Sequence, residues 1–444
     1  MIRELTRIKD ELPRILLLAL IIFLCGVFNS NAEENVLKLD LDDCKGIAIN
    51  NNTELLEAEE DIKKSKGYLL EQFSDFLPEV YLDYRYVATS SPEAGRIADD
   101  VFLYAESTAT IRMKEDIFRG GERVYKYRSA RLAVDKAKES YMSIRDKLLF
   151  DVKTAYYDLL LAEELISLYG ESKRRMEAYT SKITRKSKVG DVTKYAVLRA
   201  NIEIEIMNSD LINIEKERIL YKVKMQKLLM LDEIQDISTK EALLYPAKEI
   251  REEDCSLERL LRAAEKKNRR LKVAGLSKKI GKEGINIATS RGGLRASLRS
   301  SLYKSSDKFN LMSHYYYDWS IMINVSVPLF DGLKIPALIN QSRSEYSMLV
   351  ASETTTRKDV FWETEDAVNE LQKTKPLLES QRRLAKNAEN GVNMVLVLYD
   401  RGESSEWDII DAHRNYIRAE TNLARFIRDY KVLAAKIKYL ISEE

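Results

Sequence analysis

The sequence predicts a membrane protein of mixed α/β class, in which several chains share a β-barrel that continues into long antiparallel helices. Three observations predict this class. An apolar segment lies near the N-terminus, four stretches alternate apolar and polar residues, and long helical stretches have heptad spacing. The strand and helix patterns occur twice along the chain.

The composition excludes one class of partner and favours one kind of element. The 444 residues carry 72 basic and 71 acidic side chains, for a net charge of +1. Such a balance provides no electrostatic basis for binding nucleic acid. Seven prolines and 16 glycines are few for this length, which favours long uninterrupted helices.

Residues 1–32 are typical of a secretory signal peptide. Four basic residues precede an apolar run of 14 residues at 15–28, and the tripeptide Ser-Asn-Ala ends at residue 32 with small residues at the −3 and −1 positions. The run is short for a membrane-spanning helix. We therefore expect cleavage after Ala32, with a retained membrane anchor as the alternative.

The residue types that carry enzyme chemistry are sparse. After cleavage the chain keeps two cysteines, Cys44 and Cys255, and two histidines, His314 and His413. Two thiols cannot form a disulfide framework for a chain of this size. No nucleophile, metal or phosphate-binding motif is present in the sequence. We therefore expect no enzyme activity, no cofactor and no metal site.

The mature chain contains an internal repeat. Residues 116–120 (DIFRG) align with residues 328–332 (PLFDG) at an offset of 212, and upstream, where the offset is 216, Asn52 aligns with Asn268. Each copy is expected to contain a helix, two strands, a long helix, a glycine turn and a second long helix. The boundaries that we expect are a first repeat at 33–229, a connecting segment at 230–256 and a second repeat at 257–444.

Four stretches are predicted to be β-strands, at about 79–88, 101–115, 294–303 and 315–328. In each, apolar and polar side chains alternate, so that they point to opposite faces. The length of the alternation, the aromatic residues at one end and the charges on the polar face indicate a lipid-facing band around a water-filled interior. The alternative is a half-buried sheet in a soluble protein. Four strands are too few to close a barrel, and open edges are not tolerated in lipid, so several chains must share it.

Four long helices are predicted at about 120–189, 192–229, 332–400 and 404–442. Their apolar residues recur at alternating steps of four and three, which favours coiled-coil packing. One such series is Leu148, Val152, Ala155 and Leu159. These helices are far too polar to lie in lipid.

Each second strand runs into a long helix through a short turn. The two turns contain Phe118, Gly120, Gly121, Pro328, Phe330 and Gly332. Glycine permits a sharp change of direction, and proline suits a strand end where no ladder hydrogen bond is needed. We expect these turns to mark where the chain leaves the membrane.

Four stretches together resemble the TolC-type outer-membrane efflux proteins. They are LDLDDCKGIAINNNTELLEAEEDI, FLPEVYLDYRY, VSVPLFDGLKIPALINQSRSEY and LYDRGESSEWDIIDAHRNY. Their order, spacing and duplication carry the resemblance, which covers essentially the whole mature chain.

The resemblance implies a homotrimer in which four strands from each chain form a twelve-stranded barrel in outer-membrane lipid, continued by an α-helical tunnel across the periplasm. It implies a passive exit duct that works with a periplasmic adaptor protein and an inner-membrane pump of the RND, ABC or MFS class, in drug efflux or type I secretion. The alternative is a secreted coiled-coil oligomer, such as an adhesin stalk, with a soluble β cap.

The resemblance also implies site residues at the helical hairpin tips, which would form the gate and dock the adaptor. The tips are Val189, Gly190, Asp191, Arg401, Gly402 and Glu403. Asp408 and Asp411 match the paired aspartates of the family's entrance, where six carboxylates in a trimer would attract cations and raise one another's pKa values. Alternatively, they only favour the helix dipole. Arg199, the repeat equivalent of Asp411, is a candidate partner for an aspartate.

Overall fold

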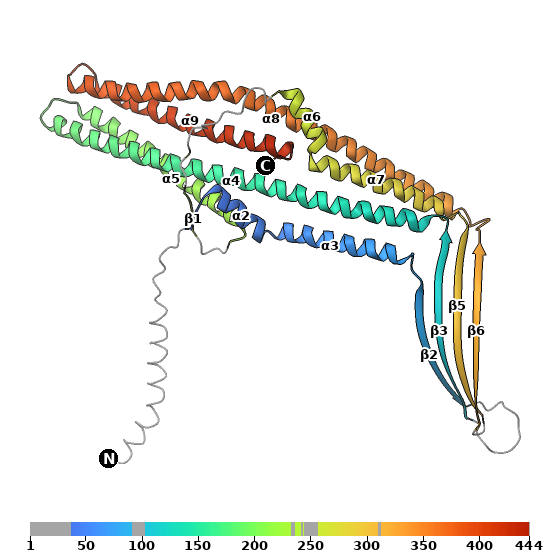
Figure 1. Cartoon of the computed structure of the whole chain (residues 1–444). Coiled ribbons are helices and arrows are strands. Elements are labelled where there is room, and N and C mark those ends of the chain that lie inside the picture. Colours follow the sequence, from blue (N-terminus) through green and yellow to red (C-terminus); the bar gives the residue numbers. More distant parts are fainter. Residues whose placement is uncertain are drawn as a thin grey trace, which may run out of the picture.

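The computed structural model describes residues 37–90, 103–231, 236–240, 243, 256–309 and 312–443. The signal peptide expected at 1–32 and most of the segment expected at 230–256 lie outside these ranges. The described chain forms a long helical body with a four-stranded sheet at one end (Figure 1). In both halves of the chain, two shorter helices precede two strands and two long helices.

Four long helices make up most of the body. They are α4 (Glu122–Lys188), α5 (Lys194–Leu229), α8 (Lys334–Asp400) and α9 (Glu406–Leu440). α4 and α8 have 67 residues each, or about 100 Å at ~1.5 Å per residue. The α4–α5 and α8–α9 turns lie together at the end of the body opposite the sheet (Figure 1).

Each half begins with two helices where the sequence analysis expected one. The pairs are α2 (Leu41–Asn51) with α3 (Thr53–Ser74), and α6 (Leu257–Lys267) with α7 (Arg269–Ser290). A single extended asparagine separates the helices of each pair. The Asn52 side chain accepts the Leu55 N–H at 3.1 Å, and that of Asn268 accepts the Leu271 N–H at 3.3 Å. Asparagine favours this N-cap geometry, which starts a new helix with a change of direction.

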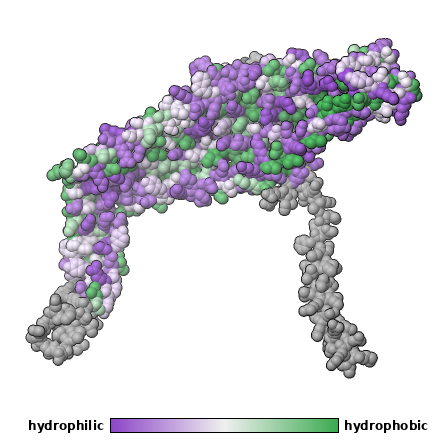
Figure 2. Space-filling model, turned by 180° about the vertical axis from the view of Figure 1, so that it is seen from behind, coloured by the Kyte–Doolittle hydropathy of each residue, from purple (hydrophilic) through white to green (hydrophobic). Residues whose placement is uncertain are grey.

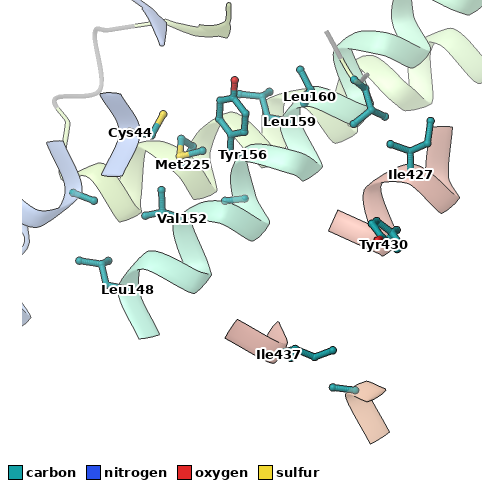
Figure 3. Close-up of a cluster of buried hydrophobic side chains, with 14 of the residues drawn as sticks. Cys44, Leu148, Val152, Tyr156, Leu159, Leu160, Met225, Ile427, Tyr430 and Ile437 are labelled. Atoms are coloured by element: carbon teal, nitrogen blue, oxygen red, sulfur yellow. The ribbon is translucent and has the colours of Figure 1, made fainter. Parts of the chain in front are cut away.

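The largest buried cluster lies where α2, α4, α5 and α9 meet (Figure 3). Cys44 of α2 and Met225 of α5 lie beside Tyr156 of α4, and Tyr430 of α9 contributes to the same cluster. The predicted heptad residues of α4 are buried in it: Leu148, Val152, Ala155 and Leu159. Burying one leucine-sized side chain contributes about 1.5–3 kcal/mol. This cluster therefore holds the hairpins of both halves together.

The four strands form one antiparallel sheet in the order β2-β3-β5-β6. Their bounds are β2 (Glu79–Ser90), β3 (Leu103–Arg119), β5 (Arg295–Phe309) and β6 (Met312–Ser326). Pairing of β3 with β5 joins the two halves of the chain, and β2 and β6 are the free edges. β3 ends four residues later than expected, because a bulge between Glu115 and Phe118 lets pairing with β5 resume.

A second, two-stranded sheet was not predicted from the sequence. β1 (Leu37–Leu39) pairs in parallel with β4 (Ile237–Thr239). Strands of three residues are too short to show an alternating pattern. The pair is anchored on α4, because the Glu163 carboxylate accepts the Thr239 N–H at 3.2 Å.

Candidate functional site

One face of the four-stranded sheet is apolar and exposed. A single row across all four strands consists of Leu82, Ile111, Leu302 and Trp319. These four side chains are between 48% and 76% exposed in one chain. A soluble protein would have to cover such a face, because contiguous exposed apolar surface of this kind marks a contact with lipid or with another protein.

The opposite face of the sheet carries polar and charged side chains that bond to one another across strands. Arg112 of β3 forms an ion pair with Asp83 of β2 at 2.7 Å. The Tyr303 hydroxyl of β5 donates to the Asp318 carboxylate of β6 at 2.7 Å. The sheet thus has one face suited to lipid and one suited to water.

Two consecutive residues in the left-handed region turn each second strand into its long helix. Gly120 and Gly121 have φ values of 61° and 89°, while Gly332 and Leu333 both have φ of 69°. At Gly120 space also excludes a side chain, because a Cβ would lie 2.3 Å from the carbonyl oxygen of Ser290. At Gly332 nothing lies within 4 Å of that position. The two turns have similar backbones but different surroundings.

The first of these turns is held by Arg123, which the sequence analysis did not identify. Its guanidinium donates to the carbonyl oxygens of Asp75 and Ile117, each at 2.7 Å, and lies 5.0 Å from the Phe76 ring centroid. Arg123 thereby joins the end of α3, the end of β3 and the start of α4. No local pattern marks such a residue, because its partners are backbone atoms of other elements. Phe118, Pro328 and Phe330 of the predicted turns are exposed.

The six predicted tip residues are all exposed, and they form the two helix-to-helix turns. Gly190 and Gly402 have φ values of 89° and 78°. The following residues close the turns in the same way, because the Asp191 N–H donates to the Lys186 carbonyl at 3.1 Å and the Glu403 N–H to the Leu398 carbonyl at 2.9 Å. This is the usual glycine-dependent ending of a helix.

Asp408 and Asp411 lie on the first turns of α9, and both are exposed. Asp408 forms a capping box with Ser405, whose N–H donates to the Asp408 carboxylate at 2.8 Å. This backbone hydrogen bond, with that of the Ser405 hydroxyl, lowers the pKa of Asp408. Asp411 instead accepts from the Asn415 amide at 3.0 Å. Within one chain, Asp408 therefore helps to start its helix and stays ionised.

Arg199 contacts an aromatic ring rather than an aspartate. Its guanidinium carbon lies 3.0 Å from the centroid of the Trp407 ring, and Tyr195 flanks it at 5.8 Å. Arginine stacks readily on tryptophan. The contact joins α5 to α9, so Arg199 links the two hairpins close to their tips.

A second link between the hairpins is an ion pair that the sequence analysis missed. Arg414 of α9 bonds to Glu203 of α5 through two nitrogens, at 2.5 Å and 3.3 Å, and the Glu203 side chain is only 5% exposed. Its hydrogen bond to Glu203 raises the pKa of Arg414. The neighbouring His413 is buried, and burial lowers the pKa of its imidazole. The two hairpins are therefore held together by charge as well as by apolar packing.

A metal site and a membrane-spanning helix are both absent from the part of the chain that the structure describes. No three His, Cys, Asp or Glu side chains are arranged to hold a metal ion, and no helix is long and apolar enough to cross a membrane. Cys44 is buried in the core cluster, and burial raises the pKa of its thiol to about 12. This thiol packs as a small apolar group.

The comparisons with known proteins agree with this architecture. The model of the outer membrane efflux protein family matches residues 46–229 and 260–441. The chain belongs to this family. Both matched segments contain two strands and two long helices. The family is one of channel proteins, and it places the protein in the outer membrane with its helical part in the periplasm.

Individual members of the family are only distantly similar in sequence. The outer membrane protein TolC of Vibrio cholerae is 20% identical over 373 residues, which cover 83% of this chain and 82% of TolC. The solved structure of the CmeC outer membrane channel of Campylobacter jejuni has a TM-score of 0.76 at 16% identity and covers 90% of this chain and 85% of CmeC. The open-state structure of the MtrE outer membrane channel of Neisseria gonorrhoeae has a TM-score of 0.76 at 14% identity, with coverage of 91% and 89%. At these identities the structures support the fold of this outer membrane efflux protein.

Proposed function

We propose that three copies of the chain form a passive exit duct through the outer membrane. The observation that carries this proposal is the exposed apolar face of a sheet with two free edges, β2 and β6. Edges left open in lipid are strongly unfavourable, because their backbone groups have no water to bond. Three chains with four strands each would close a twelve-stranded barrel and pair every edge.

The helical body also has apolar surface that a neighbouring chain would cover. On α5, Tyr195, Leu198, Ile202 and Ile206 are between 46% and 67% exposed. Their spacing of three or four residues places them along one side of the helix, away from the buried Ala200 and Met207. Figure 2 shows hydrophobic patches interrupting the hydrophilic surface of the body. A trimer buries such stripes between its chains and forms a helical tunnel.

The hairpin tips are the surface at which we propose that partners dock. They lie at the end of the body opposite the barrel strands, so they face the interior of the cell when the strands are in the outer membrane (Figure 1). A periplasmic adaptor protein would bind there and connect the duct to an inner-membrane pump of the RND, ABC or MFS class. The pump supplies the energy, and the duct catalyses no reaction.

The entrance is the second part of the proposal. In a trimer, the exposed Asp408 and Asp411 side chains would place six carboxylates around the tunnel axis. Because Ser405 holds Asp408 ionised, at least half of this ring stays negative near neutral pH. A ring of ionised carboxylates binds cations and restricts flow.

The duct is tested by channel formation. We expect the purified mature protein to run as a trimer that dissociates on heating, and to form ion-conducting pores in planar lipid bilayers. The α5 variant Leu198→Lys/Ile202→Lys, which we expect to remain monomeric, should form no pores. A mature protein that is monomeric and soluble without detergent would contradict the proposal.

Asp411→Asn tests the entrance without disturbing the helix start, whereas changing Asp408 would also remove the capping box. We expect the single-channel conductance of Asp411→Asn to exceed that of the wild type, because three of the six charges are lost. Glu258→Gln, which removes an exposed carboxylate on α6, should leave the conductance unchanged. Equal conductance in all three proteins would remove the entrance role of Asp411 and leave the duct intact.

A further inference from the structure

The polar face of the sheet is not evenly charged along its length. In the rows nearest the helical body, most cations are paired with carboxylates. Arg112 pairs with Asp83, Lys114 with Glu79 at 3.7 Å, and Arg119 with Asp116. Each of these carboxylates is therefore already neutralised by a neighbour on the same face.

Three cations at the same end of the sheet have no such partner. Arg295 and Arg299 are exposed on β5, and Lys334 is exposed at the start of α8. Among the described residues, none of the three forms an ion pair with an acidic side chain. The two acids that line a groove with Arg295 and Lys334 have other partners, since Glu122 pairs with Arg291 at 3.7 Å and Asp331 accepts the Ile335 N–H at 2.6 Å. We call Arg295, Arg299 and Lys334 the cationic belt.

The three belt residues lie on one surface. Arg299 is directly opposite Lys114 of β3, and Arg295 is directly opposite Arg119. Arg295 and Lys334 line one groove where the sheet meets the helices. Because Lys114 and Arg119 already pair with Glu79 and Asp116, neither position opposite the belt offers Arg299 or Arg295 a free acid.

The belt is separated from the acids farther along the same face. Asp318 lies in the row of Tyr303, four residues along β5 from Arg299, or about 13 Å at ~3.3 Å per residue. Charges in water are screened beyond about 8–10 Å at physiological salt. The carboxylate of Asp318 therefore does not cancel the positive potential of the belt.

We propose that the cationic belt is an anion filter at the junction of barrel and tunnel, and that the duct favours cargo with carboxylate, phosphate or sulfonate groups. This inference rests on the proposed function, because the polar face lines the lumen only if three chains close the barrel. Three chains would place nine unpaired positive charges around one level of the lumen. Rings of arginine and lysine select anions in pores.

The test is the reversal potential of the mature wild-type protein in a neutral-lipid bilayer under a KCl gradient. We expect the Arg295→Gln/Arg299→Gln variant to show a chloride-to-potassium permeability ratio about two- to threefold below that of the wild type. The reason is that the interaction energy between a fixed unit charge and a permeating ion in water is close to the thermal energy. The Asp411 carboxylates at the entrance also affect permeability, but they are the same in both proteins. The difference between the two permeability ratios therefore reports on the belt alone. The matched control, Asp83→Asn/Arg112→Gln, removes one ion pair together and should leave the ratio unchanged.

The outcomes separate the filter from the duct. Open wild-type pores whose ratio matches that of the belt variant would overturn the filter and leave the duct standing, whereas the absence of any wild-type current would overturn the duct and the filter with it. If the belt variant fails to assemble, a measurement on wild-type pores alone tests the filter. Millimolar pyrophosphate should then reduce their current if the belt binds anions, and unaffected current would overturn the filter.

Discussion

Single residues at the strand-to-helix turns show how similar backbones can differ in tolerance. Gly120 and Gly332 are repeat equivalents, and both have positive φ. Only Gly120 is closely packed, against the carbonyl oxygen of Ser290 at the end of α7. Arg123 adds two hydrogen bonds at the first turn alone. The first junction is therefore built more rigidly than the second.

This difference predicts unequal effects of one substitution. Gly332→Ala introduces only left-handed strain, worth about 1–2 kcal/mol. Gly120→Ala adds a backbone clash, so we expect a clearly larger drop in the temperature at which the detergent-solubilised trimer dissociates. Equal drops for the two variants would show that the contact with Ser290 does not constrain Gly120.

The ion pair of Glu203 and Arg414 makes a second prediction at the residue scale. Glu203→Gln leaves the Arg414 guanidinium without its carboxylate, at a cost of about 1–3 kcal/mol. The hairpins should then separate more often, which raises amide hydrogen exchange in α5 and α9 near the tips. Glu258→Gln breaks an exposed pair with Arg262, which is worth less than about 1 kcal/mol, and should leave exchange at the tips unchanged. Equal exchange in the two variants would argue against the ion pair as a link.

At the scale of elements, the alternation of residues along β5 gives the sheet two different faces. Adjacent residues of β5 face opposite environments, because side chains alternate along a strand. Leu302 lies in the apolar row, and Ser301 bonds to Ser320 on the polar face at 2.8 Å. Both lie near the middle of the strand, which would lie near the centre of the bilayer if the strand crosses the membrane.

Two lysine substitutions one residue apart test this assignment. Lysine on the lipid face near the bilayer centre costs about 2–4 kcal/mol, and a trimer would bear this cost three times. We expect Leu302→Lys to abolish recovery of heat-labile trimer from the outer-membrane fraction, while Ser301→Lys retains it. Similar recovery of the two variants would mean that Leu302 does not face lipid.

The asparagine breaks are an element-scale feature that sequence analysis missed. Asn52 and Asn268 were aligned as repeat equivalents, but the apolar pattern runs on across each of them. A capping side chain acts on one backbone N–H, so it leaves no periodic signal. The expected single helix in each half is for this reason two helices.

The whole molecule leaves surfaces uncovered that one chain cannot bury. The apolar stripe of α5 and the apolar face of the sheet are exposed at opposite ends of the molecule. In our proposal lipid covers the sheet face, and neighbouring chains cover the stripe. The assembly should therefore depend on α5 as much as on the strands.

Leu198→Lys/Ile202→Lys tests that dependence. Six lysines facing neighbouring chains would repel one another and lose apolar contact, so we expect monomers rather than trimers in detergent and no pores in bilayers. Lys216→Leu, which removes an exposed charge from the same helix, should still yield trimers. Trimeric Leu198→Lys/Ile202→Lys protein would place the subunit contact elsewhere.

The sequence alone determined the strands and their two faces, the four long helices and the glycine turns, because alternation, heptad spacing and glycine geometry are local properties of the chain. Only the tertiary structure decided which distant side chains meet. Glu203 and Arg414, which form an ion pair, are 211 residues apart in the sequence. Arg199 contacts the Trp407 ring and not an aspartate. Strand register places Arg295 and Arg299 opposite cations. Such contacts depend on how elements pack in space, and no local pattern of residues encodes that packing.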